Sequence, residues 1–251
     1  MSKKKTVSEL NQHQINATTK LSTFISSLIA SGNPLLQSKA DKLSYWLEDW
    51  TTFLEYEPSF SATKLRRYKR GEIVKVHLGF NIGSEEGGLH YAVVVEKNNA
   101  KSSPVVTVVP LTSIKPTTNL ERLHSGNVFL GNELFTSLSS KFSLANKHIQ
   151  SELVLLSELV TVTKTSSQAE SAQITEKINS LNYELELLER MRSEVAKMKK
   201  GSIALVNQIT TISKIRIYDP KTDHDILSGV KLSNEKLDAI DKEIIAKYTK
   251  G

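Results

Sequence analysis

The sequence predicts an α+β fold in which a β-rich domain is interrupted by a helical hairpin. Strand-like apolar patterns in residues 71–115 return in residues 201–219, and the apolar residues between them, in 140–200, have helical spacing. Helical spacing also occurs at both ends of the chain. We therefore expect four parts in order along the chain: an N-terminal helical extension in 1–60, a first β part in 61–130, an inserted antiparallel coiled-coil hairpin in 131–200, and a second β part with a C-terminal helix in 201–251.

The N-terminal extension is expected to form two helices within residues 8–57. Asn33 and Pro34 fit the start of the second helix, because asparagine caps helices and proline is accepted at the first helical position. The apolar residues that follow recur at spacings of three and four and form one face. They are Leu36, Ala40, Leu43, Leu47, Trp50 and Leu54. Pro58 is expected to end this helix.

A basic connector follows in residues 59–70. Its cations are Lys64, Arg66, Arg67, Lys69 and Arg70, and Tyr68 lies among them. Such a segment suits contacts with RNA phosphates, with Tyr68 stacking on a base. A solvated linker between the helices and the β domain explains the same composition, and both interpretations stay open.

Three strands are predicted in the first β part. Val74, Val76 and Leu78 alternate with polar residues, which is typical of a half-buried strand. Residues 91–95 form a short apolar run that suits a strand buried on both faces, and residues 105–109 form a third strand. We expect His77 to be a surface histidine, and a groove shared with His90 is the other possibility.

The inserted segment has the spacing of two heptad-patterned helices joined near residues 165–167. The apolar positions are Ile149, Leu153, Leu156 and Val160 in the first helix and Ile174, Ile178, Leu181, Leu185, Leu188 and Val195 in the second. The hairpin packs either on itself or on a second protomer or partner. A last helix is expected to begin after Ser233, whose hydroxyl suits an N-cap.

Composition places the chain among ordinary globular proteins, with 39% hydrophobic and 24% charged residues. Without cysteine it has no disulfide and no thiolate metal site, and none of its six histidines has zinc-site spacing, so we expect neither a metal nor a cofactor. No apolar run is long enough for a membrane span, and no signal peptide is evident, which favours a cytoplasmic protein. The net charge of +6 favours polyanionic partners.

Four ordered blocks carry a more specific signal. They are Arg70–Glu72, the glycine-rich Gly83–Gly88, Val108–Ser113 and Leu205–Lys214. In character and order these blocks resemble the PemK/MazF toxins of type II toxin–antitoxin systems. The N-terminal helices and the inserted hairpin lie outside the core of that family and resemble the elaborations of a larger variant.

The resemblance implies a dimeric SH3-like β-barrel that cleaves single-stranded RNA without a metal and is neutralised by an antitoxin protein. By position, the catalytic residues are His90, where the family usually has arginine, and Thr112 with Ser113. The residues expected to bind RNA are Arg70, Ser84, Glu85, Gly87, Gly88, Gln208, Lys214 and Arg216.

Three positions depart from the family pattern, because His90, Thr210 and Ser213 replace charged residues. Histidine can still act as an acid or base near neutral pH, but it lacks the permanent forked charge of arginine. A second hypothesis therefore stays open: a catalytically degenerate PemK/MazF-like module that binds RNA or protein and acts through its helical elements.

Overall fold

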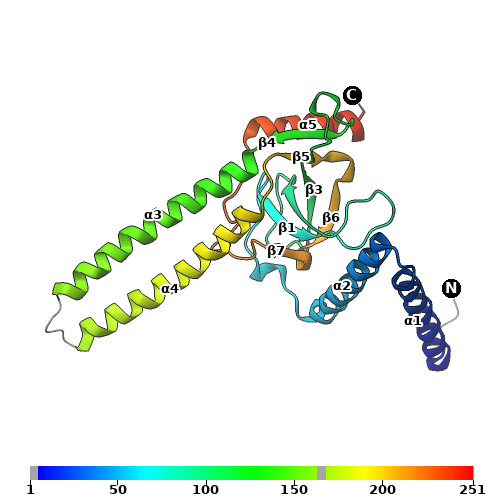
Figure 1. The fold of residues 1–251 in the computed structure, drawn as a ribbon, viewed down its shortest axis with the longest axis horizontal. Coiled ribbons are helices and arrows are strands. Elements are labelled where there is room, and N and C mark those ends of the chain that lie inside the picture. Colours follow the sequence, from blue (N-terminus) through cyan, green and yellow to red (C-terminus); the bar gives the residue numbers. More distant parts are fainter. Residues whose placement is uncertain (1–4, 163–167, 251) are drawn as a thin grey trace. The chain divides into compact units, whose positions relative to one another are not determined.

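The computed structural model describes residues 5–162 and 168–250 (Figure 1). It combines helices with antiparallel strands, and helices occur at both ends of the chain, as predicted. The described residues form two compact units. One contains the N-terminal helices and the loop 79–88, and the other contains residues 61–78 and the described part of 89–250. The expected joint of the hairpin, near 165–167, lies outside the described residues.

The N-terminal unit contains helices α1 (Val7–Ala30) and α2 (Pro34–Tyr56), which pack on each other. The predicted start of α2 is confirmed, since the Asn33 side chain accepts a hydrogen bond of 2.9 Å from the Leu35 amide. Ala40 is buried on the predicted apolar face. Trp50 and Leu54, however, remain about half exposed, so the end of that face is not covered within the described chain.

The second unit is built on a seven-stranded antiparallel sheet. Its strands are β1 (Ile73–His77), β2 (Leu89–Val94), β3 (Val105–Ser113), β4 (Asn127–Gly131), β5 (Ser202–Leu205), β6 (Thr210–Ser213) and β7 (Ile217–Asp219). The pairing order is β4-β5-β3-β2-β1-β7, with β6 also paired to β3. Among the described strands, no pairing joins β4 to β7, so the sheet is not closed.

Strand β3 organises this sheet because it pairs with three neighbours in turn. Its first residues pair with β6, its middle with β2, and its last three residues with β5. Because β5 follows the inserted helices in sequence, this pairing joins the two separated β parts. The prediction that strands before residue 131 and after residue 200 meet in space is thereby confirmed.

Alternation along the strands creates two apolar cores on opposite faces of the sheet. One face carries Ile73, Val93 and Val109, which pack with residues of the helices and of the loop after β7. The other carries Val76, Ala92 and other residues that pack with Tyr68, Ile212 and Ile217. Both faces of the central strands are therefore buried, as predicted for residues 91–95.

The inserted helices are α3 (Glu133–Val162) and α4 (Gln168–Lys197), which lie side by side and run in opposite directions (Figure 1). The heptad residues Ile149, Leu181 and Leu188 are buried. Farther out, Leu153 and Ile178 are about 40% exposed. The helices therefore bury their apolar seam near the sheet and leave much of it exposed farther away. In the described residues, no helix has the length and apolar character that crossing a membrane would require.

The C-terminal helix α5 (Asn234–Tyr248) begins where it was predicted. The Ser233 side chain accepts from the Lys236 amide at 3.3 Å, and its hydroxyl donates to Glu133 at 2.6 Å. Since Glu133 is the first residue of α3, one serine caps α5 and links it to the inserted hairpin. The buried residues Leu237 and Ile240 complete the packing of α5 against the sheet.

Candidate functional site

The block Arg70–Glu72 connects the sheet to helix α5. Gly71 has a φ of 82°, and a Cβ there would lie 2.7 Å from a methyl group of Leu237. The Arg70 guanidinium lies 2.5 Å from Asp241 of α5 and donates to the carbonyl oxygen of Val95. Arg70, which we predicted to bind RNA, is therefore held against α5 in this structure.

The glycine-rich loop of residues 79–88 belongs to the unit of the N-terminal helices. The Gly88 amide donates to the Gly79 carbonyl at 2.7 Å and closes the loop. A Cβ at Gly87 would lie 2.8 Å from the same carbonyl oxygen, so this close approach of backbone requires glycine. Two of the predicted RNA-binding residues, Ser84 and Glu85, are exposed on the loop.

The structure brings the three predicted catalytic residues to one end of the sheet. His90 near the start of β2 has its Nδ1 atom 3.3 Å from the carbonyl oxygen of Leu111, which directly precedes Thr112 and Ser113. His90 is paired with Val76 of β1, so the two residues share a face. By alternation along β3, Thr112 lies on the face of His90 and Ser113 on the face of Leu111.

The groove shared by two histidines is not formed. His77 lies one position after Val76, and therefore points to the face opposite that of His90. Its ring centroid is 6.5 Å from that of Tyr218, and its carbonyl accepts from the Arg216 guanidinium at 2.7 Å. His77 is therefore part of the packing around β7.

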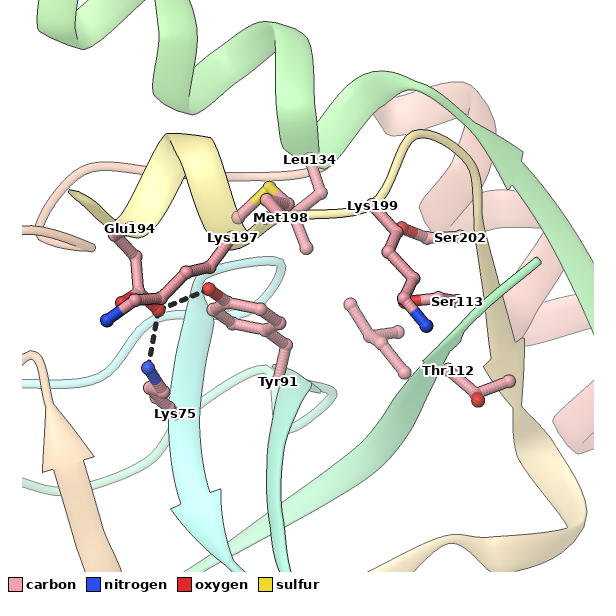
Figure 2. Close-up of a pocket in the computed structure, with 11 residues that line it drawn as sticks. Lys75, Tyr91, Thr112, Ser113, Leu134, Glu194, Lys197, Met198, Lys199 and Ser202 are labelled. Carbon is pink, nitrogen blue, oxygen red and sulfur yellow. Dashed lines mark hydrogen bonds and ion pairs between the residues drawn. The ribbon is translucent and has the colours of Figure 1, made fainter. Parts of the chain in front are cut away.

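A cavity of about 240 Å³ opens on the Ser113 side of β3. The sheet contributes residues from β1, β2, β3 and β5, and the end of α4 with the segment after it contributes the opposite wall (Figure 2). The lining residues with polar side chains are Lys75, Tyr91, Thr112, Ser113, Glu194, Lys197, Lys199 and Ser202. In Figure 2 the Lys199 side chain extends toward Ser113, whereas Thr112 points away from Glu194.

Glu194 of α4 joins the two halves of this cavity. Its Oε1 atom accepts a hydrogen bond from the Tyr91 hydroxyl and lies 2.5 Å from the Lys75 ammonium (Figure 2). Burial would raise the pKa of the Glu194 carboxyl, but the hydrogen bonds from Lys75 and Tyr91 and the charges of Lys75 and Lys197 outweigh it and lower that pKa. Glu194 is therefore an ionised acceptor at neutral pH. Burial and the bond to Glu194 raise the pKa of the Tyr91 hydroxyl, which stays a donor.

The predicted RNA-binding residues of the last block lie elsewhere. Lys214 is 1% exposed, and its ammonium donates to the carbonyl of Ala100 at 3.0 Å, so it does not reach a surface that RNA could contact. Burial lowers the pKa of Arg216, whose Nε donates to the His77 carbonyl. Gln208 is partly buried in the short helix after β5.

The structure also contradicts the stacking of Tyr68 on a base. Its side chain is fully buried, and its hydroxyl donates to the Pro220 carbonyl at 2.7 Å. It therefore cannot stack on a base in this structure. Its neighbour Arg66 pairs with Glu72 and Asp223, so this part of the connector packs into the fold.

Sequence reasoning did not single out the cavity around Glu194. The sequence pattern places Lys75 only on the polar side of a strand and Tyr91 only in an apolar run. Glu194 lies beside a heptad position, where an acidic residue usually only solvates a helix. Its role depends on a contact that joins residues more than 100 positions apart. Among the described residues, no cluster of three or more histidine or acidic side chains is arranged to hold a metal ion.

The comparison with protein families matches residues 69–168 to the PemK-like, MazF-like toxins of type II toxin–antitoxin systems. The matched stretch contains β1 to β4, His90, Thr112 and Ser113, and it ends at Gln168, the first residue of α4. A comparison with curated proteins finds no match. The sheet-derived wall of the cavity comes mainly from the matched stretch, whereas Glu194, Lys197 and Lys199 come from outside it.

Proposed function

Because the chain carries a PemK-like, MazF-like toxin domain, we propose that it is a toxin-like endoribonuclease that cleaves single-stranded RNA without a metal. An antitoxin protein neutralises it in this proposal, and the reaction takes place in the cytoplasm. His90, Thr112 and Ser113 form the reaction centre. The observation that supports this assignment most strongly is the 3.3 Å approach of His90 to the backbone just before Thr112 and Ser113.

The proposed reaction is an attack by the ribose 2′-oxygen on the adjacent phosphorus. The 2′-hydroxyl gives up its proton to a base, and the new O2′–P bond forms. The P–O5′ bond breaks, and the leaving 5′-oxygen takes a proton from water. A neutral imidazole whose Nδ1 donates to the Leu111 carbonyl carries its lone pair on Nε2, and we assign the base to that atom of His90. The hydroxyl group of Thr112, which shares the face of His90, is suited to hydrogen-bond the oxygens of the reacting phosphate.

Lysines on the Ser113 side of the sheet supply positive charge for binding the RNA backbone. Lys75 and Lys199 line the cavity next to Ser113, and their charges attract phosphate groups. The exposed side chains of Ser84 and Glu85, on the loop of the N-terminal unit, are assigned to further RNA contacts.

We also propose an architecture and an oligomeric state for the chain. Residues 61–130 and 201–251 form one small SH3-like barrel, into which 131–200 are inserted as a coiled-coil hairpin, with 1–60 as an extension. The active form is a homodimer. The pairing of β3 with β2, β5 and β6 supports this architecture, because one strand belongs to both separated β parts.

Purified protein and a long single-stranded RNA, incubated with EDTA, test the activity directly. We expect fragments that end in a 2′,3′-cyclic phosphate and begin with a 5′-hydroxyl. Thr112→Ala should lower the cleavage rate by about 100-fold, which is the range for loss of one group that stabilises developing charge. Thr117→Ala, in the exposed segment after β3, is the matched control and should cleave like the wild type. Intact RNA at high protein concentration would contradict the proposal.

A second candidate function is binding without cleavage, through the barrel or the helical elements. It is favoured by the neutralisation of Lys75 by Glu194 and by the exposed apolar residues of α3, such as Val154 and Leu155. In that case the same incubation leaves RNA intact, while removal of residues 145–185 abolishes binding of RNA or of a protein partner. Unchanged binding after that removal would exclude the helical elements from this role.

A further inference from the structure

The cavity beside Ser113 holds more positive than negative charge. Lys75, Lys197 and Lys199 line it together with one carboxylate, that of Glu194. Among the described residues, Lys199 takes part in no ion pair, and its side chain extends toward Ser113 (Figure 2). The hydroxyl groups of Ser113 and Ser202 add donors that suit the oxygens of an anion. A volume of about 240 Å³ leaves room for a phosphate-sized group beside Glu194.

Glu194 uses the two donors that the sheet directs into this cavity. One of its oxygens accepts hydrogen bonds from both the Tyr91 hydroxyl and the Lys75 ammonium, which come from neighbouring strands. Lys75 and Tyr91 are paired residues of β1 and β2, so their side chains leave the same face. This arrangement of two fixed donors is an anion-binding position, and a carboxylate of the chain itself fills it.

The position of Glu194 along α4 disfavours its negative charge. It lies in the last turn of a 30-residue helix, where the helix dipole disfavours negative charge. The carboxylate therefore depends on Lys75, Tyr91 and Lys197 for its stabilisation. Glu194 lies at a helix end, next to the four-residue link to β5. Its side chain can therefore leave Lys75 and Tyr91 when a stronger anion competes for these two donors.

We propose that this cavity binds a phosphate group of single-stranded RNA and that Glu194 is an internal anion that occupies its donors in the free protein. The choice of RNA as the source of the phosphate rests on the proposed function, whereas the anion site rests on the cavity alone. Binding moves Glu194 away from Lys75 and Tyr91, and the phosphate oxygens take over both donors. Glu194 thereby weakens RNA binding, although it lies outside the stretch that matches the toxin family.

The test measures binding of a labelled, single-stranded 2′-O-methyl oligonucleotide by fluorescence anisotropy at low salt. This probe cannot be cleaved through its 2′-oxygen, so the readout does not depend on activity. Glu194→Gln keeps the shape of the side chain and an acceptor for Tyr91, but it removes the charge. We expect this variant to bind the probe about tenfold more tightly, because a like charge next to the phosphate is lost.

Glu189→Gln is the matched control. Glu189 lies on the same helix and is 71% exposed outside the cavity, so its substitution changes the net charge equally. We expect less than about twofold tightening in this variant, because solvent and salt screen its charge. Lys199→Met leaves the ion pair of Glu194 intact and should weaken binding roughly fivefold, since one phosphate partner is lost.

Tighter binding by Glu194→Gln alone, with weaker binding by Lys199→Met, would establish the site. Equal affinities of Glu194→Gln and Glu189→Gln, or weaker binding by Glu194→Gln, would overturn the proposal. Should Glu194→Gln not fold, unchanged affinity of Lys199→Met would overturn it as well. Failure of the nuclease proposal can be told apart from failure of this one. In that case RNA stays intact in the cleavage assay, while Glu194→Gln still binds the inert probe more tightly.

Discussion

Single residues of the recognisable blocks serve the fold as much as the reaction. Glu72 is 2% exposed, accepts the Lys69 amide at 2.9 Å and pairs with Arg66, while Gly71 makes room for Leu237 of α5. The charged residues and the glycine of this block therefore hold the chain in place at the start of β1 and determine how closely α5 packs. The residues that we assign to chemistry lie farther along, at the start of β2 and the end of β3.

Tyr68 provides a test at the scale of one hydroxyl. In Tyr68→Phe the buried Pro220 carbonyl loses its donor, so we expect the free energy of unfolding to fall by about 1–3 kcal/mol. Denaturant unfolding followed by circular dichroism measures it. Tyr45→Phe removes a hydroxyl from a side chain that is 64% exposed and should change the free energy by less than about 0.5 kcal/mol. Equal effects in the two variants would exclude a structural role for the Tyr68 hydroxyl.

The resemblance to the toxin family assigned His90 and Thr112 to one site, but it did not indicate where the basic residues lie. Lys214 stands in a block that resembles a family motif, and its burial is decided by the Ala100 carbonyl and the Tyr68 ring, both more than 100 residues away. A lysine is usually exposed, so no local pattern indicates that one is buried. The same limit applies to Glu194, whose partners come from β1 and β2.

At the scale of elements, helix starts were more predictable than helix packing. Asn33 and Ser233 cap α2 and α5 as expected, because capping depends on a few neighbouring residues. The heptads of α3 and α4 indicated two paired helices, but they could not show where the seam stays buried. Strand β4 was not predicted, since Val128, Phe129 and Leu130 are all apolar and show no alternation.

Lys141 tests how α3 is fastened to the rest of its unit. Its ammonium donates to the carbonyls of Asp225, Ile226 and Ser228 at 2.8–3.0 Å, and burial lowers its pKa. We expect Lys141→Met to lower the free energy of unfolding by about 2 kcal/mol, because three carbonyls lose a charged donor.

The control for this prediction is Lys147→Met, which removes an exposed lysine of the same helix. It should leave the unfolding midpoint nearly unchanged. A midpoint shift in Lys147→Met as large as that in Lys141→Met would mean that the loss of a lysine from α3, rather than the three hydrogen bonds, causes the effect.

At the scale of the whole molecule, the chain is a β domain that tolerates a long helical insertion. Residues at the two ends of the insertion pair directly, Gly131 with Ser202, so α3 and α4 leave and re-enter the sheet at one place. The entropic cost of closing a loop grows slowly with its length, so the fold can accept a long insertion with little loss of stability. The return of the chain to the same sheet after the insertion was therefore predictable from the sequence. The grouping of loop 79–88 with the N-terminal helices was not, because it depends on tertiary contacts alone.

The nuclease proposal is tested most directly by induced expression in cells, followed by mapping of new RNA 5′-hydroxyl ends. We expect the wild type to arrest growth and to produce discrete new ends, and both effects should vanish in His90→Ala and Thr112→Ala. His124→Ala, which replaces an exposed histidine before β4, should behave like the wild type. Normal growth and intact RNA in cells that contain soluble wild-type protein would contradict the proposal.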